Sequence, residues 1–264
     1  MENQDESSWR ELQTVTTATR VIEALAELDG AGVTELASHL ELSKSSVHAH
    51  LATLRKADYL TKDGDEYRLS YQFLLLGEYV RNGSLLFQFG RAKINHLAQE
   101  TGHYAHLFTE ENGLGINIHE SRGEEASDYE YQSRKLQQRE PLHVTASGKA
   151  ILAYLPEDRV REIVQEHGLP QMTENTITRE EELLEELETI RNRGFAINDE
   201  EEIAGFRAVA APVRIQGDEI LGSISVSGPT AFFSEEKLRD DISDRVMNTA
   251  GMIEVEINMS DESI

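Results

Sequence analysis

Hydroxyl and small side chains cluster ahead of a predicted helix in the second half of the chain. Thr145, Ala146 and Ser147 come directly before Gly148, and the sequence predicts a helix over residues 146–155. A helix that begins this way offers unbonded backbone amides at the positive end of its dipole, where a carboxylate or another small anion can bind. A capped helix that binds nothing is the alternative, so the pattern indicates small-molecule binding without proving it.

A second pair of hydroxyls lies in the predicted strand that ends at Pro229. Ser225 and Ser227 alternate with Ile224 and Val226, so both hydroxyls face one side of the strand. If that side faces the helix that carries Ser147, a small polar pocket forms on an apolar floor. Serines bonded to neighbouring backbone would need no ligand, and both interpretations stay open.

Known catalytic motifs do not fit these residues. Gly148-Lys149 is not a phosphate-binding loop, because no glycine stands five residues earlier and alanine follows the lysine. Ser147 lies in neither a Ser-x-x-Lys nor a Gly-x-Ser-x-Gly motif. Ser147, Lys149 and Glu201 could belong to a metabolite-processing enzyme with an accessory helical domain, but they supply no nucleophile, base and orienting group. We expect no enzyme activity, and we expect Lys149 to be solvated or bonded to C-terminal helix carbonyls.

Metal and cofactor sites are not expected either. The chain has no cysteine, which excludes disulfides and thiolate metal ligands. His103 and His106 are three residues apart in a predicted strand, so they point to opposite faces and cannot chelate one ion.

The elements that position these residues predict an α+β domain. Strands are expected over 104–109, 114–120, 209–215 and 219–227, and helices over 146–155, 156–168, from Thr178 to Gly194, and from Ser234 onward. Thr178 and Glu181 have the spacing of a capping box, and Gly194 stands where a left-handed cap is expected. Gln216-Gly217-Asp218 indicates a tight hairpin. The prediction is an antiparallel sheet with packed helices.

The first part of the chain predicts a helix-turn-helix. Two amphipathic segments lie within residues 34–60, and Glu41-Leu42-Ser43 between them is too short for a structured loop. Ser43 is a suitable N-cap for the second helix. The face of that helix opposite Val47 is small and polar, which suits a helix in the DNA major groove. An ordinary helical hairpin on another domain is the alternative.

A predicted wing follows the second helix. Asp63-Gly64 is a strong hairpin signal, and Lys62 and Arg68 on its flanks could reach backbone phosphates. A third helix over residues 17–28 would close the small core. The candidate DNA contacts are Lys44, Ser45, Ser46, His48, Ala49, Arg55, Lys62 and Arg68.

The chain divides into four predicted parts. Residues 1–11 form a disordered acidic tail, and residues 12–71 form the winged helix-turn-helix, with the helix-turn-helix at about 33–56 and the wing at about 60–70. Residues 72–100 form a helical linker and residues 101–258 the second domain. The linker is so apolar that it needs a partner, either within its own chain or in a second copy.

Charge is the unusual feature of the composition. The 264 residues include 49 Asp and Glu against 25 Lys and Arg, a net charge of −24, and the basic residues are 18 Arg but only 7 Lys. This balance is typical of a cytoplasm of molar salt, although an acidic mesophilic protein is possible. No apolar run is long enough for a transmembrane helix, so we expect a cytoplasmic protein without membrane contact. The charge also leaves open a sensor that has lost DNA binding and acts through protein contacts.

Several motifs in order resemble the IclR family of transcriptional regulators. They are the winged helix, the Gly148-Lys149-Ala150 helix start, the segment from Gly194 to Gly205, the strand from Ala210 to Val213, and Ser225 to Pro229. The resemblance covers nearly the whole chain. It implies a winged helix-turn-helix joined by a linker helix to a GAF/PAS-like effector-binding domain.

The resemblance also implies partners and a ligand site. Homodimers or dimers of dimers would bind palindromic double-stranded promoter DNA, under control of a small organic acid or sugar-derived effector, to regulate a catabolic or metabolic operon. The effector residues carried over by position are Ala146, Ser147, Asn198, Ala208, Ser225 and Ser227. The chain departs from the family pattern at Asn198, where some members have an acidic residue, and at Ala49, where many have arginine.

Overall fold

The computed structural model describes residues 11–261, apart from residues 127–138, 217–218 and 235–237. The chain forms two compact units, residues 1–80 and residues 81–264. The predicted tail at residues 1–11 lies outside the described residues except for Glu11, and so does most of the predicted hairpin at residues 216–218.

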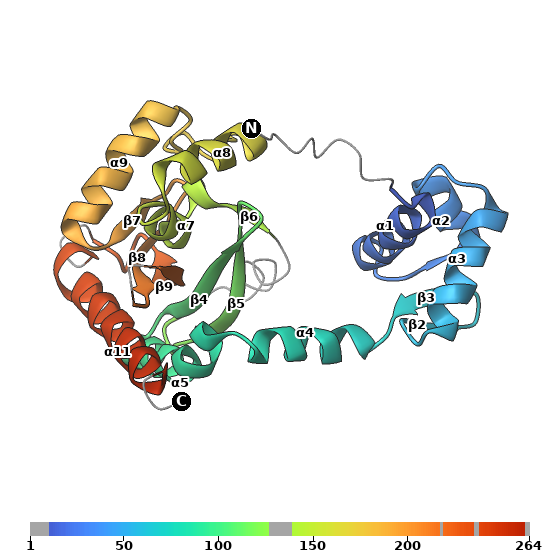
Figure 1. Ribbon diagram of the computed structural model, residues 1–264, viewed down its shortest axis with the longest axis horizontal. Helices are drawn as coiled ribbons and strands as arrows, with labels where there is room; N and C mark the ends of the chain where they lie inside the picture. Colours follow the sequence, from blue (N-terminus) through green and yellow to red (C-terminus); the bar gives the residue numbers. More distant parts are fainter. Residues whose placement is uncertain (1–10, 127–138, 217–218, 235–237, 262–264) are drawn as a thin grey trace, which may run out of the picture. The chain divides into compact units, whose positions relative to one another are not determined.

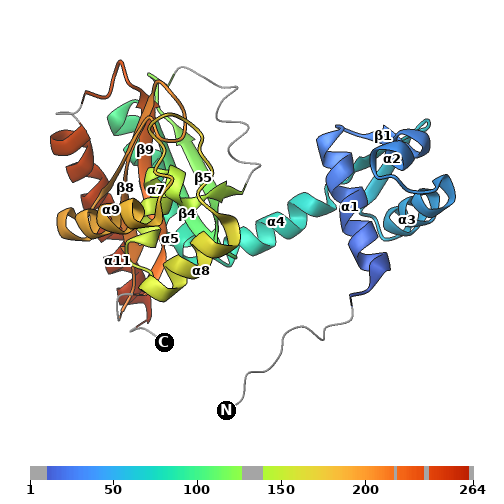
Figure 2. The same ribbon diagram turned by 90° about the horizontal axis from the view of Figure 1, so that it is seen from above.

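The first unit is a winged helix of three helices and a three-stranded sheet. Its elements are α1 (Gln13–Glu27), β1 (Ala31–Gly32), α2 (Val33–His39), α3 (Lys44–Lys56), β2 (Leu60–Asp63) and β3 (Glu66–Leu69), with strand order β1-β3-β2 (Figure 2). Ser43 caps α3 as predicted, because its hydroxyl accepts from the Ser46 amide at 3.1 Å. Val21, Leu36, Val47 and Leu51 are fully buried in the core between the helices.

Helix α4 (Gln72–Asn82) follows the wing and has an exposed apolar surface. None of its residues, all of which the structure describes, is buried. Leu75 is 64% exposed and Tyr79 is 81% exposed. The two helices of the predicted linker, residues 72–100, therefore differ. Helix α5 (Leu85–Thr101) finds its partner within its own chain, where Leu86, Ile94 and Leu97 are buried, whereas the apolar residues of α4 stay exposed.

The second unit is a six-stranded antiparallel sheet with helices on both faces (Figure 1). The strands are β4 (Tyr104–Glu111), β5 (Leu114–Arg122), β6 (Glu140–Pro141), β7 (Ala196–Asp199), β8 (Phe206–Arg214) and β9 (Ile220–Pro229), in the order β6-β5-β4-β9-β8-β7. One face carries α5 (Leu85–Thr101) and α11 (Ser243–Asp261). The other carries α7 (Ala146–Leu152), α8 (Glu157–His167) and α9 (Glu180–Arg193). Two short turns, η2 (Leu142–Val144) and η3 (Leu238–Ile242, a π-helix), precede α7 and α11.

The two faces of the sheet have separate cores because strand side chains alternate. Leu107 of β4 packs with Ile94 and Ile253 of α5 and α11, whereas its neighbour Phe108 packs with Ile151 on the α7 side. Polar residues between the sheet and α7 are the exception that forms the candidate site.

Three expected helix boundaries differ from the structure. The capping box at Thr178 is wrong, because Arg179 is the extended N-cap residue of α9 and makes no side-chain cap bond. Glutamates at the first three helical positions favour the helix dipole there instead. Helix α7 ends at Leu152, and α1 begins at Gln13 rather than at residue 17. The predicted start of the last helix at Ser234 adjoins residues 235–237, which lie outside the described residues, and the Leu238 amide donates to the Ser234 carbonyl at 3.0 Å. The left-handed cap at Gly194 is confirmed, with φ of +85°.

The described helices include none that is both long and apolar enough to cross a membrane.

Candidate functional site

Helix α3 presents the predicted DNA-reading face to solvent. Lys44, Ser45, His48 and Ala49 are exposed, and Ser46 is half-buried at the first turn. Buried Val47 and Leu51 hold the opposite side of the helix against α1 and α2. Arg55, in the last turn, is also exposed. The structure therefore brings six of the candidate DNA contacts onto one helix.

The wing places its two cations differently from each other. Lys62 lies over the Tyr67 ring, with Nζ 5.1 Å from the ring centroid. Arg68 turns back towards α1, where its guanidinium lies 3.4 Å from Asp29 and 3.2 Å from Glu66. A phosphate would have to compete with both carboxylates for Arg68. No sequence pattern pointed to the Asp29 partner, which is 39 residues away.

A small polar pocket lies between the sheet and the start of α7. Its cavity volume is about 20 Å³, little more than one water molecule needs. The described residues that line it are His106, Phe108, Asn117, Glu140, Thr145, Ala146, Ser147, Glu202, Ala208, Ser225 and Ser227. Any ligand larger than water must therefore move the walls.

Five of the six candidate effector residues lie in this lining. Ala146 and Ser147 come from the first turn of α7, Ala208 from β8, and Ser225 and Ser227 from β9. The two serines face the same side of β9, as alternation predicts.

Asn198 is buried but does not line the pocket. Its amide nitrogen donates to the Val144 carbonyl at 3.0 Å, and its oxygen accepts from the Glu201 amide at 2.9 Å. Both ends of the side chain are thus bonded to backbone, so Asn198 holds the pocket loops in position.

Strands β4 and β5 supply lining residues that the sequence did not identify as ligand residues. The Nε2 atom of His106 lies 3.0 Å from the Ser227 hydroxyl, and Asn117 lies beside the same ring. His106 pairs with Ser225 across β4 and β9. These residues could be assigned to the pocket only if the order of the strands in the sheet were known. The alternation of side chains within one strand does not show which strands are neighbours.

The expected anion site at the start of α7 is smaller than predicted. The Thr145 hydroxyl accepts from the Gly148 amide at 2.9 Å, so that amide is already bonded. The Ser147 carbonyl accepts from the Ser223 hydroxyl at 3.0 Å. The helix has only seven residues, which limits the dipole available for an anion.

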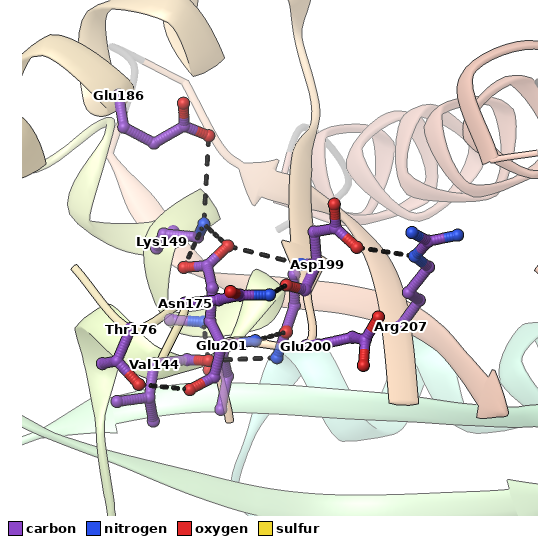
Figure 3. A network of polar contacts seen from close by, with 12 residues as sticks. Val144, Lys149, Asn175, Thr176, Glu186, Asp199, Glu200, Glu201 and Arg207 are labelled. Carbon is purple, nitrogen blue, oxygen red and sulfur yellow. Dashed lines mark hydrogen bonds and ion pairs between the residues drawn. The ribbon is translucent and has the colours of Figure 1, made fainter. Parts of the chain in front are cut away.

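Lys149 is the largest change from expectation. It is 1% exposed, and its ammonium donates to both carboxylate oxygens of Glu201 at 2.6 and 2.7 Å (Figure 3). Glu186 lies further away, at 3.9 Å. Burial raises the pKa of the Glu201 carboxyl, and the Lys149 ammonium opposes that rise. The prediction of a solvated lysine is wrong, because only a partner 52 residues away makes its burial possible.

The Lys149–Glu201 pair fastens the segment between β7 and β8 to α7. The Thr176 hydroxyl donates to the Glu201 carbonyl at 2.6 Å, and Asn175 donates to the Asp199 carbonyl at 3.1 Å (Figure 3). Glu202, next in the segment, lines the pocket. The pair is a structural tie across the pocket wall.

Histidines do not gather into a metal site in the part of the chain that the structure describes. No group there of three or more His, Asp or Glu side chains could hold an ion. His103 is buried with its ring 4.7 Å from the Phe233 ring, whereas His106 faces the pocket.

Comparison with known proteins identifies both units. Residues 82–255 match the family "Bacterial transcriptional regulator IclR C-terminal", and residues 14–64 match the IclR helix-turn-helix domain. The chain belongs to the IclR family. It is a DNA-binding transcription regulator with an effector-binding domain, and the family is not enzymatic. The resemblance and the fold class expected from the sequence are confirmed.

Relatives and solved structures extend over nearly the whole chain. A probable HTH-type transcriptional regulator ArcR of Halobacterium salinarum is 37% identical and covers 94% of this chain and 95% of its own. The HTH-type transcriptional regulator KdgR of Escherichia coli is 30% identical, over 83% of each chain. The crystal structure of the Thermotoga maritima IclR protein is 25% identical, with a TM-score of 0.77 over 94% of this chain and all of that one. The IclR regulator therefore shares both the helix-turn-helix and the C-terminal domain with these family members.

Proposed function

We propose that this IclR-family protein regulates a catabolic or metabolic operon by binding a palindromic promoter site as a homodimer, or as a pair of such dimers. The observation that carries the proposal is one chain that holds an exposed, capped recognition helix and a closed polar pocket in separate units. A protein of this kind acts in the cytoplasm, where the DNA is.

Base contacts come from the first turns of α3 in this proposal. Lys44, Ser45, Ser46 and His48 supply hydrogen bonds to base edges, and Ala49 allows close approach and contact with a thymine methyl group. Arg55 and the wing cations Lys62 and Arg68 serve the phosphates, with Arg68 the weaker contributor because of its two carboxylate partners.

The exposed face of α4 supports the dimer. Leu74, Leu75, Tyr79 and Val80 are all more than half exposed, and a second copy of the same helix would bury them in an isologous contact. The two recognition helices of a dimer then meet two half-sites of a palindrome.

The pocket is the proposed effector site. Four hydroxyl side chains, those of Thr145, Ser147, Ser225 and Ser227, and His106 suit a small organic acid or a sugar-derived metabolite. Ligand binding by a structural relative supports this use of the domain: an IclR homolog from Microbacterium hydrocarbonoxydans was crystallised with 4-hydroxybenzoate. That chain is 20% identical, so the likeness carries the fold and not the identity of the ligand.

Gel shifts in molar potassium chloride, with the chain's own upstream region, test the DNA half of the proposal. High salt is chosen because the acidic composition and the relative from Halobacterium salinarum favour a halophilic protein. Lys44→Glu should weaken binding by about 1–3 kcal/mol, the value of a base contact. Arg179→Glu makes the same charge change on an exposed side chain of the second unit and is the matched control. Equal binding by wild type and Lys44→Glu would mean that α3 is not the reading helix, and a lack of binding to every promoter fragment would favour a sensor that acts through protein contacts.

A thermal-shift screen of organic acids and sugar-derived metabolites tests the effector half. A true effector should lose its stabilising effect in Ser225→Val and keep it in Thr249→Val. Thr249 also carries a buried hydroxyl, but on α11 at the other face of the sheet. A ligand that stabilises both variants equally binds outside the pocket. If the protein converted that ligand to a product, the alternative of a metabolite-processing enzyme would apply.

A further inference from the structure

Strand β5 contains a bulge that points two neighbouring polar residues to opposite faces of the sheet. His119 pairs with Leu107 and Asn117 pairs with Phe108, which leaves Ile118 as an extra residue. Without a bulge, residues two apart in a strand face the same side. Here Asn117 shares the pocket face with Phe108, and His119 shares the α5 face with Leu107.

On the pocket face, Asn117 ties the His106 ring to the bulge. The Asn117 amide lies 3.0 Å from His106 Nδ1. In the amide orientation that satisfies both of its ends, the oxygen accepts from His106 Nδ1, and the nitrogen donates to the carbonyls of Leu107 and His119 at 3.0 and 2.8 Å. The other ring nitrogen of His106 lies 3.0 Å from the Ser227 hydroxyl. A displacement of Ser227 in the pocket wall would therefore move the His106 ring, and the ring would move the Asn117 amide. That amide is bonded to the two backbone carbonyls at the bulge.

On the other face, His119 contacts α5, the second helix of the predicted linker. Its Nε2 atom donates to Asn95 of α5 at 2.9 Å, and its ring meets the edge of Phe87 at 5.7 Å. The guanidinium groups of Arg81 and Arg91 lie over the Phe87 ring, 4.8 and 5.8 Å from its centroid. Arg81 belongs to the last turn of α4, so this cluster fixes the junction between α4 and α5.

We propose that Asn117 and His119 are positioning residues that transmit a change in the pocket to the α4–α5 junction. The inference rests on the proposed function of the pocket as the effector site. The cavity of about 20 Å³ forces its walls to move for any ligand larger than water. The bulge is the one place in the β4–β5 ladder where the register already shifts, so it can yield without breaking the neighbouring strand pairs.

Ser227→Val tests the route without knowledge of the ligand. The larger apolar side chain removes the bond to His106 and pushes on the pocket wall, and the Ser227 side chain faces the pocket, on the side of the sheet away from α5. The His119 ring proton signals, assigned by their loss in His119→Gln, should shift in Ser227→Val. Thr109→Val removes a half-buried hydroxyl bond directly beside the bulge, from Thr109 to the Leu221 carbonyl, but outside the contacts of His106 and Asn117, and should leave these signals in place.

Amide hydrogen exchange then measures whether the change in the pocket reaches the junction between α4 and α5. In Ser227→Val, amides of residues 81–90 should exchange about fivefold faster, the factor that corresponds to one hydrogen bond of about 1 kcal/mol. Combined with Asn117→Ala or with His119→Leu, Ser227→Val should have no added effect on these amides. His119→Gln keeps a donor for Asn95 and should preserve the response.

Two results would overturn the proposal. The first is that the His119 signals do not change in Ser227→Val. The second is that Ser227→Val speeds amide exchange in residues 81–90 by the same factor whether or not Asn117 or His119 is replaced. Neither result depends on DNA or on an effector. Gel shifts of the same variants test the function separately, since a regulator that binds DNA without this coupling would disprove only the route.

Discussion

Removal of the Lys149 charge should be among the most destabilising single changes in the effector domain. Lys149→Met leaves the Glu201 carboxylate, 10% exposed, with only a long bond of 3.4 Å from the Asp199 amide. An unpaired buried charge costs about 3–5 kcal/mol. That is a large part of the total stability of about 5–15 kcal/mol expected of a domain.

Glu201→Gln should cost less than Lys149→Met, because the lysine keeps a second carboxylate. Glu186 lies 3.9 Å from its ammonium and can approach once Glu201 is neutral. The double variant has neither charge, so no unpaired charge is left. Its loss of unfolding free energy should therefore be smaller than the sum of the losses in the two single variants.

Urea unfolding at a fixed potassium chloride concentration, followed by circular dichroism, measures these differences. Arg161→Gln is the matched control, because Arg161 also contacts two glutamates, Glu157 and Glu180, but at the surface. It should produce no measurable loss. If Lys149→Met unfolds at the same urea concentration as Arg161→Gln, or if the single losses simply add, the tie is not a coupled buried pair and the reasoning fails.

Three further predictions concern packing, protonation and assembly. Gly148→Ala should destabilise the domain strongly in the same urea assay, because a Cβ atom there would lie 2.1 Å from the Leu142 carbonyl oxygen, whereas Gly251→Ala on α11, where a Cβ meets nothing, should not. Burial, then Arg81 and Arg91, lowers the pKa of His119 from its ordinary 6.5, so the unfolded state binds more protons and stability should fall as the pH drops below about 6.5. His119→Gln should flatten that part of the stability–pH curve, and an unchanged slope would contradict the assignment. Leu75→Asp with Tyr79→Asp should convert the dimer to monomers in sedimentation, and a dimer that survives both changes must use another surface.

Local sequence determined the winged helix almost completely. The Ser43 cap, the Asp63-Gly64 turn and the apolar spacing around Val47 and Leu51 act within a few residues of one another, so pattern and structure agree. The motif order also identified the family, and alternation alone put Ser225 and Ser227 on one side of β9. The local prediction was wrong at Thr178, because the helix begins one residue later, after Arg179, with three glutamates in its first turn.

Only the tertiary structure decided what surrounds each polar residue. Lys149 meets Glu201, Arg68 meets Asp29, and Asn117 meets His106 across elements whose pairing no local pattern encodes. The β5 bulge is a further example, since one extra residue reverses the faces of all that follows and leaves no mark in the hydrophobic pattern. Burial of a charge or an amide is decided by partners distant in the chain. The residue types of the pocket were therefore predictable, and their partners were not.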